Sequence, residues 1–115
     1  MMELHLLNAL TDLVAGRVFA NVAKADTVKP FITYQAVGGQ PINYTTGEVP
    51  DRENTRVQIN VWASAHLEAT TLGKQVEIAL RTSPNLQAEV LTGRAATYDE
   101  TVDAHGTMQD FSFWN

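Results

Sequence analysis

The chain has 115 residues, a formal net charge of −5, and 44% apolar against 18% charged side chains, which fits one domain with a substantial core. Lysine and arginine are scattered singly, and no stretch approaches the roughly 20 apolar residues of a membrane helix. We therefore expect it to bind neither a nucleic-acid backbone nor a membrane. The absence of cysteine excludes disulfides, thiolate catalysis and cysteine-bound metals.

The first part of the chain predicts one helix and two extended segments. Leucines at helical spacing, followed by Gly16 at the place of a left-handed cap, indicate a helix over about residues 2–15. Residues 17–20 form a short extended piece, and a polar connector at 21–29 follows. The segment 31–37 is rich in β-branched and aromatic residues, which predicts a strand.

The next segment, residues 39–54, is turn-forming and mostly polar, and it is long for a connection inside so small a domain. Long loops of this kind are usually functional or disordered. Apolar Ile42, Tyr44 and Val49 give this loop a means of contact, so we expect it to dock on a neighbour as an arm. The loop also carries the charged residues Glu48, Asp51, Arg52 and Glu53. These can pair with charges on a partner, and a plainly solvated loop is the alternative.

Residues 55–63 alternate between apolar and polar side chains, which is typical of a half-buried strand. Val57, Ile59 and Val61 fall on the face that meets a core. Trp62 falls among polar residues on the opposite face, and a large ring there indicates contact with another chain. A ring covered by a loop of its own chain is the alternative.

The second half of the chain predicts a helix over about residues 65–82, with Ser64 as its N-cap. Residues 88–100 read as a third strand, residues 102–106 as a turn and residues 108–114 as a last strand. The apolar face predicted for the helix comprises Leu67, Leu72, Val76, Ala79 and Leu80.

The last strand places Phe111 and Phe113 on one face and Trp114 on the other. Two tryptophans, Trp62 and Trp114, therefore lie off the core on the same sheet. Because tryptophan is enriched at binding hot spots, this uncovered face is a candidate contact surface.

The order of elements is α-β-β-α-β-β, which predicts an α+β fold over residues 1–115 as a single domain. We expect two helices over one face of a mostly antiparallel four-stranded sheet, with the other face bare.

Side chains that could support catalysis are few. The three histidines form no metal-binding pattern, and neither a nucleophile elbow nor a phosphate-binding glycine loop is present. Asp103 and His105 flank a turn and could form a catalytic dyad or a weak metal site, with a solvated turn as the alternative. We therefore expect a protein that is not an enzyme and uses no cofactor, and a small hydrolase using Asp103 and His105 is a remote alternative.

Four segments carry a family resemblance: residues 16–19 after a leucine-rich helix, 30–34, 56–63 leading into the second helix, and 110–114. Together they resemble the tail-completion, or tail-terminator, proteins of long-tailed bacteriophages and prophages, which are similar in role to the lambda tail terminator. The most specific segment, Arg-x-Gln-x-x-Val-Trp-Ala, is a fold pattern and carries no chemistry.

The resemblance implies a structural assembly protein. Such proteins form a ring, typically a hexamer, on the last ring of the tail tube, stop tube polymerisation and offer a surface for head joining. The implied partners are copies of the same chain, the tail tube protein and the head–tail connector protein, and the implied location is the virion tail, or the host cytoplasm during assembly. A small interaction module of another contractile or secretion apparatus is the alternative.

Overall fold

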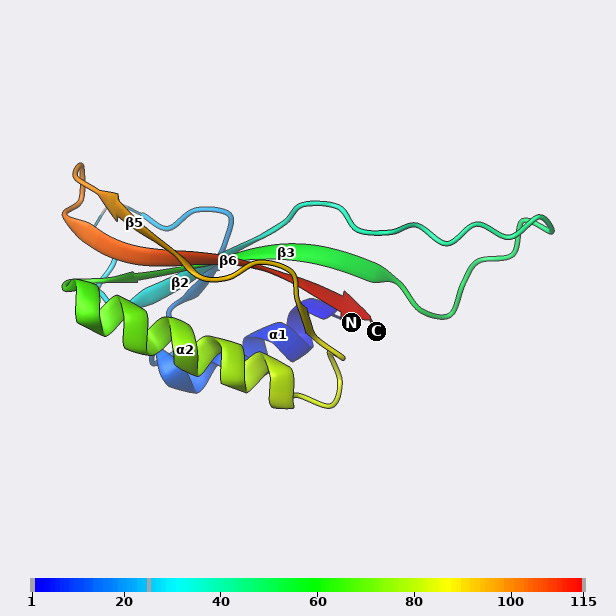
Figure 1. Ribbon diagram of the computed structural model, residues 1–115, viewed down its shortest axis with the longest axis horizontal. Helices are drawn as coiled ribbons and strands as arrows, with labels where there is room; N and C mark the ends of the chain where they lie inside the picture. Colours follow the sequence, from blue (N-terminus) through cyan, green and yellow to red (C-terminus); the bar gives the residue numbers. More distant parts are fainter. Residues whose placement is uncertain (1, 25, 115) are drawn as a thin grey trace.

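The computed structural model describes residues 2–24 and 26–114, and it confirms the α+β fold with both helices on one side of the sheet (Figure 1). In chain order the elements are α1 (Met2–Leu10), the 3-10 helix η1 (Thr11–Leu13), β1 (Val18–Ala20), β2 (Phe31–Ala36), β3 (Asn54–Ala63), α2 (His66–Thr82), β4 (Glu89–Val90), β5 (Ala95–Asp99) and β6 (Ala104–Trp114).

The sheet has six strands rather than the four predicted. Its order is β1-β2-β3-β6-β4, and β5 also pairs with β6. Every pairing is antiparallel except that of β1 with β2, which is parallel. The extended piece at 17–20 therefore contributes an edge strand that the predicted count omitted.

The third predicted strand, residues 88–100, divides into β4 and β5, which pair with different parts of β6. Between them, the Leu91 backbone N–H donates to the Asp110 carbonyl oxygen at 3.0 Å, and side chains add further bonds to β6. The amide of Gln109 donates to the Thr92 carbonyl oxygen at 3.0 Å, and the Thr92 hydroxyl accepts the Asp110 backbone N–H at 3.0 Å. The predicted turn at 102–106 is also too long, because β6 begins at Ala104 and pairs with both β3 and β5.

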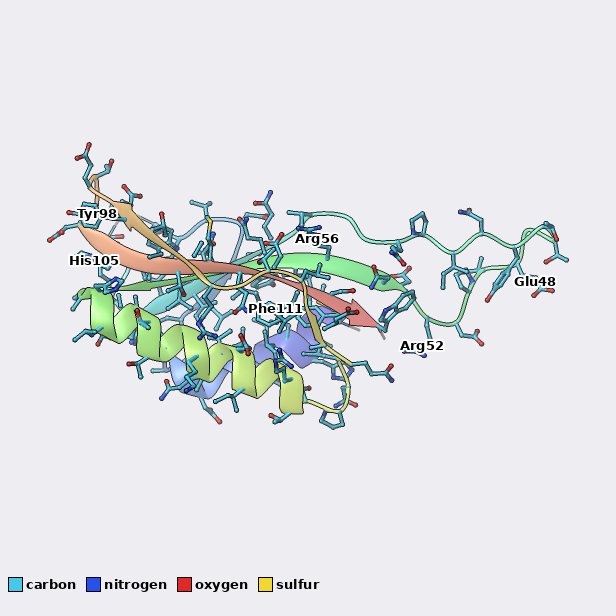
Figure 2. The ribbon with its side chains drawn as sticks, viewed as in Figure 1. Glu48, Arg52, Arg56, Tyr98, His105 and Phe111 are labelled. Atoms are coloured by element: carbon cyan, nitrogen blue, oxygen red, sulfur yellow. The ribbon has the colours of Figure 1, made fainter. Side chains whose placement is uncertain are left out.

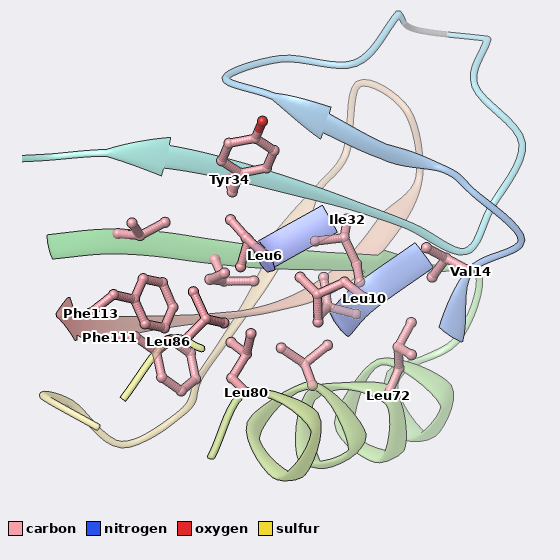
Figure 3. Packing of buried hydrophobic residues seen from close by; sticks show 14 residues of the cluster. Leu6, Leu10, Val14, Ile32, Tyr34, Leu72, Leu80, Leu86, Phe111 and Phe113 are labelled. Atoms are coloured by element: carbon pink, nitrogen blue, oxygen red, sulfur yellow. The ribbon is translucent and has the colours of Figure 1, made fainter. Parts of the chain in front are cut away.

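The core lies between the helices and the sheet (Figure 3). The alternation predicted for β3 is confirmed, since Val57, Ile59 and Val61 are at most 2% exposed. Phe111 and Phe113 on β6 are fully buried beside them. Full burial of such side chains stabilises the fold by about 1.5–3 kcal/mol each. Val14 directly after η1 joins this core, and the helices add Leu6, Leu10, Leu72, Val76 and Leu80.

The predicted helix over 2–15 is too long. α1 ends at Leu10, where the Thr11 hydroxyl bonds to the Leu7 carbonyl oxygen at 2.6 Å, and one 3-10 turn follows. Ala15 and Gly16 both have positive φ, which ends any helical path.

The start of α2 also differs from the prediction. Its N-cap is Ala65 without a side-chain cap, and the Ser64 backbone N–H instead donates to the Glu68 carboxylate at 3.2 Å. Leu67 is 77% exposed, and Ala69 takes its place on the buried face. The sequence spacing thus identified the helix but placed its first turn incorrectly.

A polar cluster joins α2 to β6 and to the segment between β4 and β5. The Glu77 carboxylate accepts hydrogen bonds from Gln109 and Arg94, each at 2.8 Å, and from Arg81 at 3.2 Å. The hydrogen bond from Gln109 lowers the pKa of Glu77 most, against the opposing effect of burial, and Arg94 and Arg81 lower it further.

The molecule is elongated, measuring 52 × 26 × 24 Å. Figure 1 shows the cause, since the chain between β2 and β3 stands away from the body as a long loop while both termini lie near its base. In the part of the chain that the structure describes, no helix combines the length and apolar character needed to cross a membrane.

Candidate functional site

The loop between β2 and β3, residues 37–53, is called the arm below. At its base, the Val37 N–H donates to the Arg56 carbonyl oxygen and the Arg56 N–H donates to the Gly38 carbonyl oxygen, each at 2.8 Å. Within residues 40–53, all of which the structure describes, a single backbone–backbone hydrogen bond forms, from Gly47 to Tyr44 at 3.0 Å. Apart from the Gln40 N–H, which donates to a side chain, the other backbone donors and acceptors of residues 40–53 are thus left to solvent or to a partner.

The base of the arm is fixed by Asn54. Its side-chain oxygen accepts the Gln40 N–H at 2.8 Å, and its amide nitrogen donates to the Ser112 hydroxyl at 2.6 Å and the Phe113 carbonyl oxygen at 3.2 Å. Gly39 allows this approach, because its φ is +147° and a Cβ there would lie 2.2 Å from the Asn54 carbonyl oxygen. Sequence reasoning missed both residues, although the Gly-Gly pair before a long loop was a signal.

Two predicted contact residues, Arg52 and Trp114, meet within one chain. The Arg52 guanidinium lies 5.8 Å from the centroid of the half-buried Trp114 ring and donates a hydrogen bond to the Gln87 side chain. The Trp114 backbone N–H also donates to the Leu86 carbonyl oxygen at 3.0 Å. The two contacts of Arg52 fasten the returning limb of the arm to the body.

The tip of the arm is exposed. Tyr44 begins the turn that ends at Gly47 and is 49% exposed, and Val49 is 88% exposed. Figure 2 shows Glu48 at the far end of the molecule. Of the sequence candidates, Tyr44 and Glu48 are thus the ones farthest from their own body.

The remaining arm candidates, Asp51 and Glu53, lie nearer the base. With Glu3 of α1 they line a hollow of about 520 Å³. Three acidic residues thus gather around the hollow between the arm and α1.

The face of the sheet turned away from the helices is called the outer face below. Across it the Arg56 guanidinium forms an ion pair with the Asp110 carboxylate at 2.6 Å. Trp62 lies opposite Gly106, where a Cβ would come within 2.9 Å of the indole ring. Glycine at position 106 therefore gives the ring room to lie across β6.

The two tryptophans lie at opposite ends of the outer face. In the β3–β6 register, Trp114 pairs with Asn54, eight positions from Trp62, which places the two about 26 Å apart at roughly 3.3 Å per residue. The alternation placed both rings off the core correctly, but they belong to two separate regions.

The sequence predicted a bare outer face, but the region around Trp62 is partly covered. Phe31 and Thr33 are only 8% and 5% exposed there. The connector after β1 and the turn after β5 cover part of it and leave a hollow of about 270 Å³, called the outer-face pocket below. Its lining is Asn21, Val22, Ala23, Lys24, Lys29, Phe31, Thr33, Asn60, Trp62, Asp99 and Val102.

The polar groups of the outer-face pocket are unevenly satisfied. The Trp62 indole N–H donates to the Thr33 hydroxyl at 3.4 Å, and the Lys29 ammonium donates to the carbonyl oxygens of Val102 and Asp103 at 2.8 and 3.0 Å. The side-chain oxygen of Asn60 is buried and accepts no hydrogen bond from any residue that the structure describes. Such an acceptor is unusual in a folded protein and needs an explanation.

The structure does not pair Asp103 with His105, the dyad that was the remote alternative to a solvated turn. The Asp103 carboxylate instead accepts the Tyr98 hydroxyl at 2.7 Å, and this bond is the main cause that raises the pKa of Tyr98. The His105 ring lies against the Tyr98 ring, with 4.7 Å between centroids. Over residues 2–24 and 26–114, no group of three or more potential metal ligands comes together.

Comparisons with known proteins find a matching family model and similar solved structures. A family model described as tail completion protein gp17 matches residues 4–114. Among solved structures, the chain is similar to the gp17 protein of bacteriophage SPP1, with a TM-score of 0.60, 17% identity, and coverage of 97% of this chain and 86% of that one. At that identity the likeness shows the fold alone. A search of curated proteins finds no significant match.

Proposed function

Because the chain belongs to the gp17 family of tail completion proteins, we propose that it caps a bacteriophage tail tube as one subunit of a ring. Family membership confirms the resemblance seen in the sequence and makes the chain a structural, tail-completion component of the virion tail. It favours a phage tail over another contractile or secretion apparatus. The proposal adds that the ring is a hexamer, stops tube growth and offers a surface to the head–tail connector.

The single observation that carries this proposal is the arm. A closed ring of identical subunits needs two different surfaces on each subunit, because its contacts run head to tail. The arm reaches beyond the body at one end of the long axis (Figure 1). It can therefore contact a neighbouring subunit, because its own body does not extend that far.

Charge supports the same role. The chain carries a net charge of −5, and the arm carries Glu48, Asp51 and Glu53 against Arg52. An acidic subunit of this kind can dock on a basic tube end or connector, where complementary charges set orientation and encounter rate.

Tube length tests the proposal. Tail-tube subunits are polymerised with increasing amounts of the protein, and lengths are measured by negative-stain electron microscopy. We expect the mean tube length to decrease as more protein is added, and each tube to carry a ring at one end. An unchanged length distribution contradicts capping.

An armless variant serves as the matched control. Residues 41–52 are replaced by Asn-Gly, a sequence that favours tight turns, which leaves β2, β3 and the core in place. Circular dichroism establishes that the variant is folded. It is expected to leave tube length unchanged, and full capping by the folded armless protein contradicts the role given to the arm.

A further inference from the structure

The two ends of the long axis carry complementary features that no residue in the described part of one chain satisfies. We propose that the tip of one copy's arm docks in the outer-face pocket of the next copy. The Tyr44 ring lies against Trp62, and the Tyr44 hydroxyl donates to the side-chain oxygen of Asn60. This inference rests on the proposed ring and names its contact.

The pocket fits an aromatic residue that carries a donor. Its volume of about 270 Å³ exceeds the roughly 150 Å³ of a cavity that accepts benzene. Trp62 and Phe31 provide apolar wall, and Asn60 contributes a buried oxygen with no donor among the described residues. A tyrosine supplies both a ring and a hydroxyl donor, which neither a phenylalanine nor an aliphatic residue does.

The arm presents such a residue. Tyr44 is half exposed at the tip turn, and its hydroxyl makes no hydrogen bond to the part of the chain that the structure describes. Val49 near the tip is 88% exposed, so the tip carries further apolar surface that its own chain leaves open. Tyrosine is also among the residues that dominate interface energetics.

The positions of the two features require two copies. Figure 2 shows Glu48 at one end of the long axis and Tyr98 and His105, which lie near the pocket's Asp99 and Val102 in sequence, at the other end. The tip therefore cannot reach the pocket of its own chain. Contact between unlike surfaces at opposite ends is heterologous, and it generates a ring when the rotation closes.

The charges agree with this pairing. Lys24 and Lys29 line the pocket, and neither forms an ion pair with a described residue. Asp99 lines it as well, so the local balance is one positive charge. Glu48 stands beside the tip turn and brings the opposite charge to the lysines.

Cysteine pairing tests the contact directly, because the natural chain has no cysteine. The double variant Glu48→Cys/Lys24→Cys places one thiol at the tip and one at the rim of the pocket. After oxidation on capped tubes and at high protein concentration in solution, denaturing gels without reductant are expected to show a ladder of linked copies. The control Glu48→Cys/Thr70→Cys moves the second thiol to the exposed surface of α2 and is expected to give no ladder.

The outcomes separate the docking contact from the capping function. A ladder from the tip–rim pair alone supports docking, whether or not the tubes are capped. Capped tubes without a ladder overturn docking and leave the proposed function standing. Absence of both overturns both proposals, and equal ladders from the two pairs overturn the specificity claimed for the pocket.

Substitution of Tyr44 gives a second, independent test. Tyr44→Ala is expected to raise the concentration that halves mean tube length roughly tenfold or more, and Tyr44→Phe, which removes only the donor, by a smaller factor. Ile78→Ala, which truncates an apolar residue 52% exposed on α2, is the control and is expected to act as wild type. Capping by Tyr44→Ala at wild-type concentrations overturns the proposal.

Discussion

Replacing Asn54 by alanine tests how the arm is held. The substitution removes three hydrogen bonds, one to the arm at Gln40 and two to β6 at Ser112 and Phe113. A hydrogen bond contributes about 0.5–1.5 kcal/mol net. The bond to Gln40 is exposed and therefore contributes at the low end of this range. The free energy of unfolding is thus expected to fall by about 2–3 kcal/mol in total.

Urea unfolding followed by circular dichroism measures that loss, and amide hydrogen exchange shows where it acts. The Gln40 amide is expected to lose protection, while the Val37 amide, bonded to the Arg56 carbonyl oxygen, keeps it. Gln58→Ala, on the same face of β3, is the control and is expected to change stability by less than about 0.5 kcal/mol. A change equally small for Asn54→Ala refutes the role given to this side chain.

Three further outcomes follow from the geometry. Phe111→Ala is expected to lower the free energy of unfolding by about 3–5 kcal/mol in urea titrations, because the ring is fully buried; a loss below about 1 kcal/mol contradicts that packing. The lowered pKa of Glu77 means that its stabilisation is complete above its ordinary pKa near 4.5 and is lost as pH falls through the lowered value. Acid titrations should thus show a flatter stability profile below pH 4.5 for Glu77→Gln, and identical profiles contradict this. Arg52→Ala is expected to change the fluorescence of Trp114 and to weaken the base of the arm by about 0.5–1 kcal/mol, whereas an unchanged spectrum contradicts the cation–π contact.

The elements that sequence reasoning predicted well are those with a strong local pattern. The period of two in β3 and the two phenylalanines of β6 required no knowledge of distant neighbours, and both were confirmed. The third predicted strand failed because β4 and β5 are defined by where they pair on β6 rather than by a pattern of their own. The prediction that Leu67 lies on the buried face was wrong, because helical spacing identifies an apolar stripe but not the point at which the stripe leaves the core.

The candidate site was predictable only in outline. The length and composition of residues 39–54 indicated an arm, yet the side chains that hold it join positions far apart in the chain, such as Asn54 and Ser112, 58 residues apart. The outer-face pocket around the unsatisfied oxygen of Asn60 is likewise lined by residues far apart in the chain, from Asn21 to Val102. No spacing along the chain encodes such contacts, whereas the fold brings them together.

The most direct test of the account is the position of this protein on isolated tails. The subunit is tagged, labelled with gold and imaged by negative-stain electron microscopy on intact tails. The account predicts label at the head-proximal end alone, on a ring that closes the tube. Label distributed along the tube, or found only at the opposite end, would contradict it.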